Sequence, residues 1–339
     1  MNLTAEQQWE LDLVKERLHV KCWRLNVDRK FDPSSSAERR PEGYVEDDPQ
    51  LSKYEYRWPE LIKEENDALD REIVKLLKTL PREDRSKLPK LDGDSLWVWG
   101  GPTPYWGGTM AEDTLVKGAD YFGAKNVVYV YGETSEKNMK LHSKYHRMLC
   151  QINGNCRTPG MQGEFDDERN AEELSRLSLT YPNVVGAMCD DVTTDYNKIV
   201  LPEAFEARYR GLKKYNDKLK MYGVIYVHEL YAKNFSLIQD YLDVVNLWFW
   251  FRDDILNYDA HIAKCRECFP GKKIIQGIFI QDYGRGACGS TPELLAYQLD
   301  KVREYMAKGV VEGAIILGDR EIKKWPTTAK AVKDYLEQQ

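Results

Sequence analysis

Short apolar runs that end abruptly in charged residues recur along this chain of 339 residues. The clearest covers residues 184–189 and leads directly into two adjacent carboxylates, Asp190 and Asp191. A second run leads into His228 and Glu229. Apolar strands that alternate with helices are typical of a parallel sheet buried on both faces. Such folds gather polar side chains at the carboxyl ends of their strands, so the pattern predicts both an architecture and the place of a site.

The alternation of strands and helices predicts eight strand–helix units, preceded by one helix over residues 5–18. The first strand is expected over 20–27, although Lys21 and Arg24 interrupt its apolar pattern. The other strands are expected over 96–99, 127–131, 184–189, 221–227, 244–251, 273–280 and 311–317. Eight units predict a closed (β/α)₈ TIM barrel that forms a single domain over residues 1–339. A doubly wound open sheet is the alternative, because the count depends on the weak first strand.

Two long segments without clear periodicity are expected to be loop insertions at the active-site face of the barrel. The first covers residues 28–56 and is rich in Pro, Ser, Glu and Arg, and the second covers residues 132–166. Both are expected to follow a strand, which makes them βα loops. Long βα loops shape the specificity of barrel enzymes, so both segments are expected at the mouth.

Composition excludes several classes of partner. The net charge is −6 and no basic stripe is evident, so neither nucleic acid nor an anionic membrane is an expected partner. No apolar run approaches the roughly 18 residues that a membrane span needs. The polar start of the chain does not resemble a signal peptide, and the seven cysteines are scattered, which favours a cytoplasmic protein. Export with later removal of a signal peptide is the alternative.

Carboxylates at the strand ends are the candidate catalytic groups. Two carboxyl groups can serve as acid and base, or as acid and nucleophile, across a glycosidic bond. Asp190 or Asp191 is expected to supply one of them, and Glu229 or Asp282 the other. Adjacent residues of a strand point to opposite sides, so only one of the two neighbouring aspartates is expected to face the barrel axis.

Aromatic side chains at the same strand ends are expected to bind substrate, because a flat apolar ring suits the C–H face of a pyranose. The expected aromatic platform consists of Trp99, Trp106, Tyr131, Trp250 and Tyr283. His228 and Arg252 are expected to fix hydroxyls or a uronate carboxylate. By strand alternation, Trp248 shares one side of its strand with Trp250, and Tyr129 shares one side with Tyr131.

The step from residues 184–189 into Asp190 and Asp191 resembles the strand-to-Asp-Asp step of some glycoside-hydrolase-like barrels. The step from residues 277–280 into Asp282 and Tyr283 resembles the seventh strand of the same barrels. The resemblance extends over residues 96–317 and implies a (β/α)₈ fold and a carbohydrate substrate. The Asn-Glu pair that follows the fourth strand in the large retaining clan is missing. The resemblance therefore assigns catalytic carboxyl groups no further than the two aspartates.

The leading hypothesis is a glycoside hydrolase that acts on an oligosaccharide or glycoside without a cofactor or metal. A Mg²⁺-dependent isomerase or lyase acting on a sugar acid is the second hypothesis, with Asp191, Glu229 and Asp253 as oxygen ligands. A sugar-binding barrel without catalytic activity is the third. The sequence makes no prediction of the oligomeric state, the sugar, the linkage or the stereochemical outcome.

Overall fold

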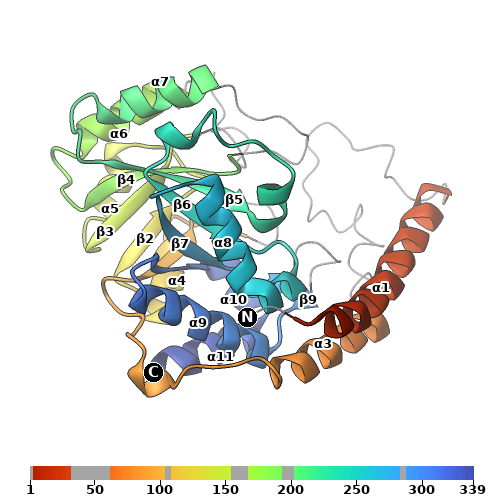
Figure 1. Cartoon of the computed structure of the whole chain (residues 1–339). Helices are drawn as coiled ribbons and strands as arrows, with labels where there is room; N and C mark the ends of the chain where they lie inside the picture. The colour runs from red at the N-terminus through yellow and green to blue at the C-terminus, as the bar shows by residue number, and fades with distance from the viewer. Residues whose placement is uncertain (1–2, 32–61, 104–107, 154–166, 193–201, 283–287) are drawn as a thin grey trace.

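Eight parallel strands close into a barrel in the computed structural model of this protein (Figure 1). The structure describes residues 3–31, 62–103, 108–153, 167–192, 202–282 and 288–339, without the side chains of 22–31 and 319. Around the barrel the strands are β1 (Leu96–Gly100), β2 (Asn126–Tyr129), β3 (Arg147–Gln151), β4 (Val184–Cys189), β5 (Lys220–Tyr226), β6 (Val244–Trp248), β7 (Lys273–Ile278) and β10 (Val311–Leu317), and β10 pairs with β1. The predicted closed (β/α)₈ barrel is confirmed, and the open sheet is wrong.

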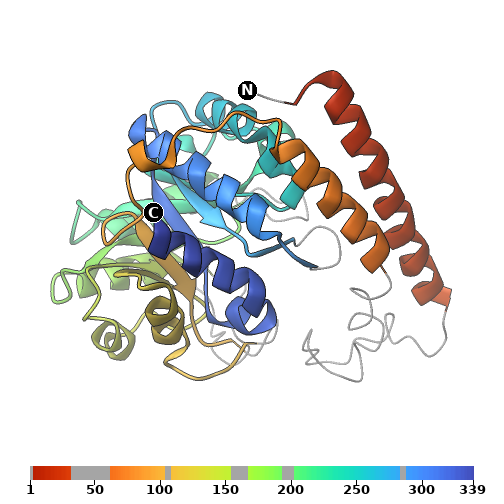
Figure 2. The ribbon, with the colours of Figure 1, turned by 90° about the horizontal axis from the view of Figure 1, so that it is seen from below.

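Helices surround the barrel, as Figures 1 and 2 show. They are α4 (Thr114–Phe122), α5 (Glu136–Leu141), α6 (Asp167–Leu177), α7 (Pro202–Lys213), α8 (Tyr258–Cys268), α9 (Pro292–Ala307), α10 (Asp319–Lys324) and α11 (Pro326–Gln338). The 3₁₀ helices are η2 (Arg85–Lys87), η3 (Val227–Tyr231), η4 (Gln239–Tyr241) and η5 (Arg252–Asn257). A short antiparallel pair, β8 (Gln281–Asp282) and β9 (Cys288–Gly289), follows β7. The helices α1 (Ala5–Phe31) and α3 (Lys63–Leu77) pack together beside the barrel (Figure 2).

The eight strands are not the eight that the sequence predicts. Residues 20–27, predicted as the first strand, belong to helix α1, in which Leu11 and Leu18 are buried one heptad apart. The missing strand is β3, which lies inside the segment 132–166 that was predicted as a loop. The count of eight is therefore right because one false strand replaced one true strand.

This exchange changes the meaning of both predicted loops. The segment 28–56 begins in helix α1 rather than after a strand, and residues 32–56 lie outside the described residues. The segment 132–166 contains α5 and β3, and residues 154–166 lie outside the described residues. The interpretation of residues 132–153 as a single βα loop is wrong, because they cross from the mouth back to the start of β3.

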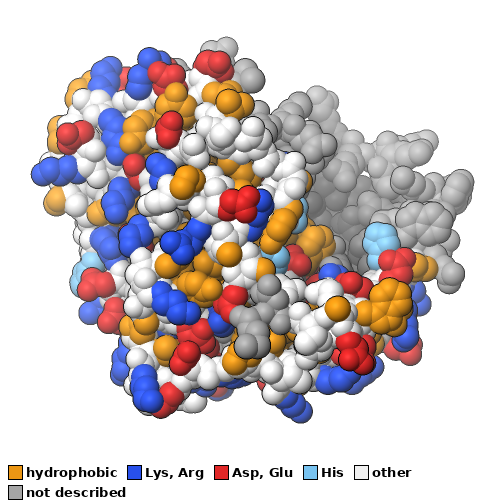
Figure 3. Space-filling view, in the orientation of Figure 1, with side chains coloured by type: hydrophobic (Ala, Val, Ile, Leu, Met, Phe, Trp, Pro, Cys, Tyr) orange, Lys and Arg blue, Asp and Glu red, His pale blue; other side chains and the backbone are white. Residues whose placement is uncertain are grey.

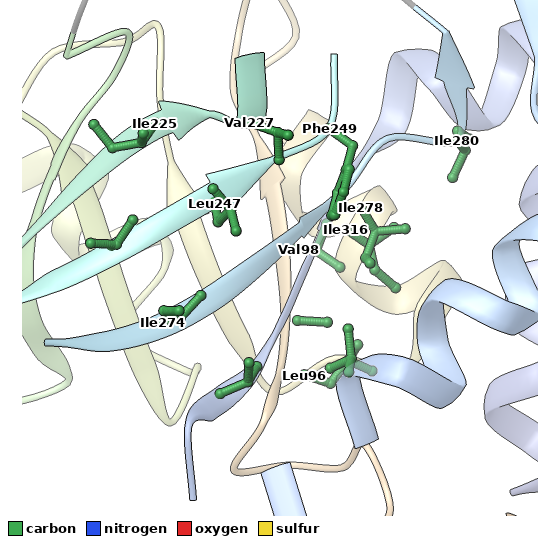
Figure 4. Close-up of a cluster of buried hydrophobic side chains, with 14 of the residues drawn as sticks. Leu96, Val98, Ile225, Val227, Leu247, Phe249, Ile274, Ile278, Ile280 and Ile316 are labelled. Carbon is green, nitrogen blue, oxygen red and sulfur yellow. The ribbon is translucent and has the colours of Figure 1, made fainter. Parts of the chain in front are cut away.

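The barrel strands bury both of their faces, as the apolar runs predict. Leu96 and Val98 of β1 belong to the layer between sheet and helices, part of which Figure 4 shows. Trp97 and Trp99, which alternate with them, point into the barrel and belong to the inner core. Gly277 of β7 is required beside this core, because a Cβ there would lie 1.9 Å from the indole of Trp248.

The exposed surface on the face shown in Figure 3 carries acidic and basic side chains interspersed over the barrel. Within the described part of the chain, no helix is both long and apolar enough to span a bilayer.

Candidate active site

A pocket of about 130 Å³ opens at the carboxyl ends of the barrel strands. Side chains from seven strand ends and from helix α10 surround it. The lining residues are Trp99, Tyr131, Asp190, Asp191, Val224, Tyr226, Trp248, Trp250, Phe279, Leu317 and Arg320. Catalytic groups of TIM barrels gather at this end of the fold, so this pocket is the candidate active site.

Asp190 is fixed at the end of β4 by the side chain of Asn153, which follows β3. The Asn153 carboxamide accepts a hydrogen bond from the Asp190 backbone N–H at 2.9 Å and donates one to the Asp190 carbonyl at 2.5 Å. The Asn153 side chain thus forms the pair of hydrogen bonds that the backbone of a further β3 residue would form with Asp190. Beneath this point, Arg208 of α7 donates to the Cys189 thiol at 3.3 Å and forms an ion pair with Asp167 of α6. Two helices therefore hold the end of β4 rigidly.

Two residues at the pocket adopt a backbone conformation that is unusual for their type. Within the described backbone, Tyr131 (φ 67°) and Asp191 (φ 44°) are the non-glycine residues with positive φ. By strand alternation both side chains would point away from the barrel axis, as Tyr129 does in the outer core layer. The left-handed conformation instead turns both into the pocket lining. Strained backbone of this kind is concentrated at functional sites, where interactions of the surrounding structure offset its energetic cost.

This finding corrects two expectations from strand alternation. Asp190 and Asp191 both line the pocket, whereas only one was expected to face the axis. Tyr129 and Tyr131 lie in different core layers, whereas they were expected to share one side. The reason is the same in both cases, because the regular strand ends before the left-handed residue and its alternation no longer applies.

The two neighbouring carboxyl groups have different surroundings. Asp190 is 6 % exposed, and burial together with the negative charge of Asp191 raises its pKa well above the ordinary aspartate value. The positive charge of Arg320 opposes that rise without cancelling it. Asp191 is less buried and accepts a hydrogen bond of 2.6 Å from the Tyr226 hydroxyl. In this pair, Asp190 therefore tends to remain protonated, and Asp191 accepts a hydrogen bond.

Aromatic rings form a continuous wall along one side of the pocket. The Trp99 and Trp248 rings meet edge to face at 5.8 Å, and Phe279 lies 4.4 Å from Trp248. Trp250 follows at 6.3 Å from Phe279 and 5.0 Å from Tyr226. Rings from β1, β5, β6 and the residue after β7 thus present apolar faces and edges next to the two aspartates.

A polar chain occupies another side of the pocket. The Trp99 indole N–H donates to the Tyr131 hydroxyl at 3.1 Å, and Arg320 Nη2 donates to the same oxygen at 3.3 Å. Arg320 also forms an ion pair with Glu321 through Nε. The guanidinium lies over the Tyr131 ring, 5.4 Å from its centre. Arg320 is thus a buried cation held between a carboxylate and an aromatic ring.

The other predicted catalytic residues do not line this pocket. The Glu229 carboxylate accepts from the Tyr226 backbone N–H at 3.2 Å and forms a 3.0 Å ion pair with Lys233. Asp282 is fully buried and pairs with Arg252 Nη1 at 2.8 Å. Each is therefore already engaged in holding a strand end in place.

Predicted substrate-binding residues divide in the same way. Trp99, Tyr131 and Trp250 line the pocket. His228 stacks on Tyr226 at 5.8 Å and is not part of the pocket lining. Arg252 lies outside the lining, where its guanidinium also binds Asp70 at 2.8 Å and Asn66 at 3.1 Å. Trp106 and Tyr283 lie outside the described residues.

Six lining residues were not among the predicted site residues: Val224, Tyr226, Trp248, Phe279, Leu317 and Arg320. Tyr226 and Trp248 could have been found, because each is the last residue of its strand and shares a side with buried residues two positions earlier. Arg320 follows the last strand within a charged stretch whose appearance is that of an exposed turn, so local sequence carries no signal for its burial.

The three carboxylates proposed as magnesium ligands are not gathered together. Asp253 pairs with Lys15 of α1 at 2.7 Å, and Glu229 pairs with Lys233. Among the described residues, no group of three or more His, Cys, Asp or Glu side chains is arranged to hold a metal ion. The donor set that this hypothesis needs is therefore dispersed, because Asp253 and Glu229 lie in separate ion pairs and Asp191 accepts a hydrogen bond from Tyr226.

No protein-family model matches the chain, and no curated protein matches it in sequence. Among solved structures, one similar fold is a protein from Bacteroides thetaiotaomicron provisionally named an α-L-fucosidase. The match has a TM-score of 0.51 and 12 % identity, and it covers 76 % of this chain and 98 % of that one. The likeness to a glycoside-hydrolase barrel that the sequence suggests is thus confirmed for the fold.

Two further solved structures align with lower scores. A family GH2 β-galacturonidase from Eisenbergiella tayi matches with a TM-score of 0.48 and 13 % identity over 74 % of this chain. A β-D-glucuronidase from Dictyoglomus thermophilum matches with a TM-score of 0.47 and 13 % identity over 74 % of this chain. The aligned part spans about half of each of these longer proteins, 52 % and 51 % respectively.

Proposed function

We propose that this protein is a glycoside hydrolase whose active site is the pocket at the carboxyl end of the barrel. One observation carries the proposal. A buried carboxyl group with a raised pKa lies beside a second carboxyl group in a pocket walled by aromatic rings. Protonated acid, neighbouring carboxylate and aromatic surface are the parts that glycoside hydrolysis requires.

Asp190 is the proposed general acid. Cleavage of a glycosidic bond needs a proton for the departing oxygen, and a carboxyl group supplies it best when its pKa is near the working pH. Burial and the charge of Asp191 shift the pKa of Asp190 in that direction. The clamp from Asn153 fixes its backbone, so that the proton is delivered from a defined place.

Asp191 is the proposed carboxylate that responds to the positive charge of the oxocarbenium-like transition state. The Tyr226 hydroxyl donates a hydrogen bond of 2.6 Å to one of its oxygens, which orients the carboxylate that would act on the sugar or on water. The strained backbone at Asp191 gives this carboxylate its direction into the pocket. Glu229 and Asp282, the partners first expected from the sequence, have no part in this proposal.

The size and charge of the pocket suggest the substrate. Its volume of about 130 Å³ is small beside the roughly 300–1,000 Å³ of common ligand sites, which favours one terminal sugar ring. Arg320 is the cation in the described lining, and Glu321 already balances its charge. A neutral sugar therefore fits better than a uronate, whose carboxylate would add to the charge of Asp191.

The test is hydrolysis of a panel of nitrophenyl glycosides that includes neutral sugars and the matching uronides. We expect turnover of at least one neutral glycoside, and loss of that turnover in Asp190→Asn. Glu229→Gln is the matched control, because it makes the same carboxyl-to-amide change at a residue outside the pocket lining.

Other results would identify the rival functions. Sugar binding by calorimetry without turnover of any glycoside would indicate a binding barrel. Activity on a sugar acid that EDTA abolishes would indicate the metal-dependent isomerase or lyase. Equal losses of turnover in Asp190→Asn and Glu229→Gln would contradict the assignment of Asp190.

A further inference from the structure

We propose that helix α1 is the interface of a dimer in which a second copy of this chain packs antiparallel to it. The contact surface is an apolar stripe on the side of α1 that is opposite to its buried residues. This surface lies apart from the active-site pocket, so it does not depend on the function proposed above.

Helix α1 is apolar on two opposite sides. Leu11 and Leu18 are buried and belong to the core. By helical geometry, Trp9 and Leu13 lie on the opposite side, and they remain 66 % and 45 % exposed. A helix that is apolar all round is typically buried on all sides. The exposed side of α1 is therefore expected to have a partner of its own.

The spacing along this side indicates that the partner is another helix. Trp9, Leu13, Glu16 and Val20 follow one another at intervals of four, three and four residues. Residues at these intervals recur every 3.5 residues on average, as they do along the seam between two paired helices. Glu16 interrupts the apolar series, and a single polar residue in such a seam can fix the register of the pair. Single apolar residues on a surface need no explanation, whereas an apolar stripe marks an interaction site.

The charges along α1 favour a second copy of this chain as the partner helix. Residues 5–16 include four acidic residues and one basic residue, whereas residues 17–31 include five basic residues and one acidic residue. An antiparallel copy places the acidic half of each helix against the basic half of the other, so both contacts are attractive. A parallel copy would instead bring like charges together. The charge pattern therefore favours a twofold, antiparallel arrangement.

A groove beside the stripe suits a partner of this kind. Helix α1 lies at the edge of the molecule in Figure 2, with α3 on its inner side. The groove has a volume of about 320 Å³ and is lined by Glu16, Arg17, Val20, Lys21 and Glu65. Because its lining carries two acidic and two basic side chains, the groove is complementary in charge to a second copy of itself.

The experiment is sedimentation velocity of the full chain from low to high micromolar concentration. We expect the wild type to form a dimer as its concentration rises. Leu13→Gln should weaken that dimer roughly tenfold or more, because each dimer buries this leucine twice. Leu237→Gln is the matched control and should dimerise as the wild type does, since Leu237 lies between η3 and η4 and is 58 % exposed. Circular dichroism checks folding, and Trp9→Gln takes the place of Leu13→Gln if that variant does not fold.

A pair of charge-reversal variants tests the antiparallel orientation. One variant carries Glu6→Lys and Glu16→Lys, and the other carries Arg17→Glu and Lys21→Glu. Each variant alone should dimerise more weakly than the wild type, because the two halves of its helix no longer attract each other. An equal mixture should form a heterodimer more readily than either variant forms a homodimer, since one acidic half again meets one basic half.

Four outcomes would overturn the proposed dimer. They are a wild type that stays monomeric at every concentration, equal dimerisation of Leu13→Gln and Leu237→Gln, charge-reversal variants that each dimerise as tightly as the wild type, and a mixture that associates no more tightly than its components. A monomeric wild type would leave the stripe to another protein or to another segment of this chain. Hydrolysis of glycosides is measured separately, so each of these outcomes would leave the proposed function intact.

Discussion

The carboxyl end of β4 and the carboxyl ends of β6 and β7 carry the same kind of sequence, an apolar strand followed closely by charged residues. At the end of β4, Asp190 and Asp191 line the pocket. At the ends of β6 and β7, Arg252 and Asp282 are buried together in an ion pair. Similar local sequences have therefore produced a candidate active site in one place and a structural brace in the other.

The difference arises from helices far away in the sequence. Asn66 and Asp70 of α3 bind the guanidinium of Arg252, and Lys15 of α1 binds Asp253. The N-terminal helices, which lie beside the barrel in Figure 1, thus contact it through the charged residues after β6. At β4, the side chain of Asn153 binds the backbone of Asp190, and Asp190 lines the pocket. The two strand ends thus differ in where their charged side chains lie, in the pocket lining after β4 and in a buried ion pair after β6 and β7.

The largest expected effect is a separation of rate from stability between the two regions. Asp190→Asn should lower kcat/KM on the order of 10³-fold, because it removes the proposed proton donor. Asp282→Asn should leave kcat/KM of the folded enzyme nearly unchanged but cost about 3–5 kcal/mol of unfolding free energy, because it breaks a buried ion pair. Turnover and urea unfolding of both variants measure this. A stable but inactive Asp282→Asn variant would contradict the structural role assigned to Asp282.

A second prediction concerns the two buried arginines. The charge of Arg320 opposes the rise in the pKa of Asp190, so Arg320→Gln should raise that pKa further. Because Asp190 must carry its proton, the alkaline limb of the kcat/KM profile should move to higher pH. Arg252→Gln should leave the limb in place and lower stability by about 3–5 kcal/mol, since it strands Asp282. An equal shift of the alkaline limb in both variants would contradict the different roles assigned to Arg320 and Arg252.

A smaller effect should appear in the stability of Asp190→Asn itself. Above about pH 4, the unfolded chain releases the aspartate proton, whereas the folded protein retains it because burial raises the pKa of Asp190. Wild-type stability therefore falls as pH rises toward the folded pKa, and an asparagine has no such loss. At neutral pH the variant should therefore melt at a higher temperature than the wild type.

The pH dependence supplies the control for this prediction. Below about pH 4 the aspartate is protonated in both states, so the two melting temperatures should converge. Thermal unfolding of wild type and variant between pH 3 and pH 8 measures the difference. A gap in melting temperature that does not change with pH would point to packing rather than to protonation of Asp190.

The barrel could be predicted because its signal is local. The run that forms β4 and the run that forms β10 begin and end where the sequence places them, since buried strands are continuously apolar. β3 was missed because it is a short strand that starts with an arginine inside a long segment without periodicity. Helix α1 was cut short because a few apolar residues of its second half imitate a strand.

The site could be predicted less completely because its signals are long-range. Sequence reasoning identified the strand end that carries Asp190 and several of the aromatic residues around it. The local sequence does not distinguish these residues from Asp282 and Arg252. The partner of Arg252 on α3 lies about 180 residues away in the sequence, and Arg252 and Asp282 are also bound to each other. The left-handed turns at Tyr131 and Asp191 are not predictable from the sequence either, because a positive φ is uncommon for any non-glycine residue, including aspartate, in which it is more frequent than in most.

The most direct test of the account is the protonation state of Asp190 in the free enzyme. Infrared difference spectra between wild type and Asp190→Asn, recorded at the pH of greatest activity, report a protonated carboxyl group by its carbonyl stretch. We expect such a band in the wild type, its loss in Asp190→Asn and its persistence in Asp282→Asn. A wild type without the band, or a band that survives in Asp190→Asn, would contradict the claim that the end of β4 holds the acid of the active site.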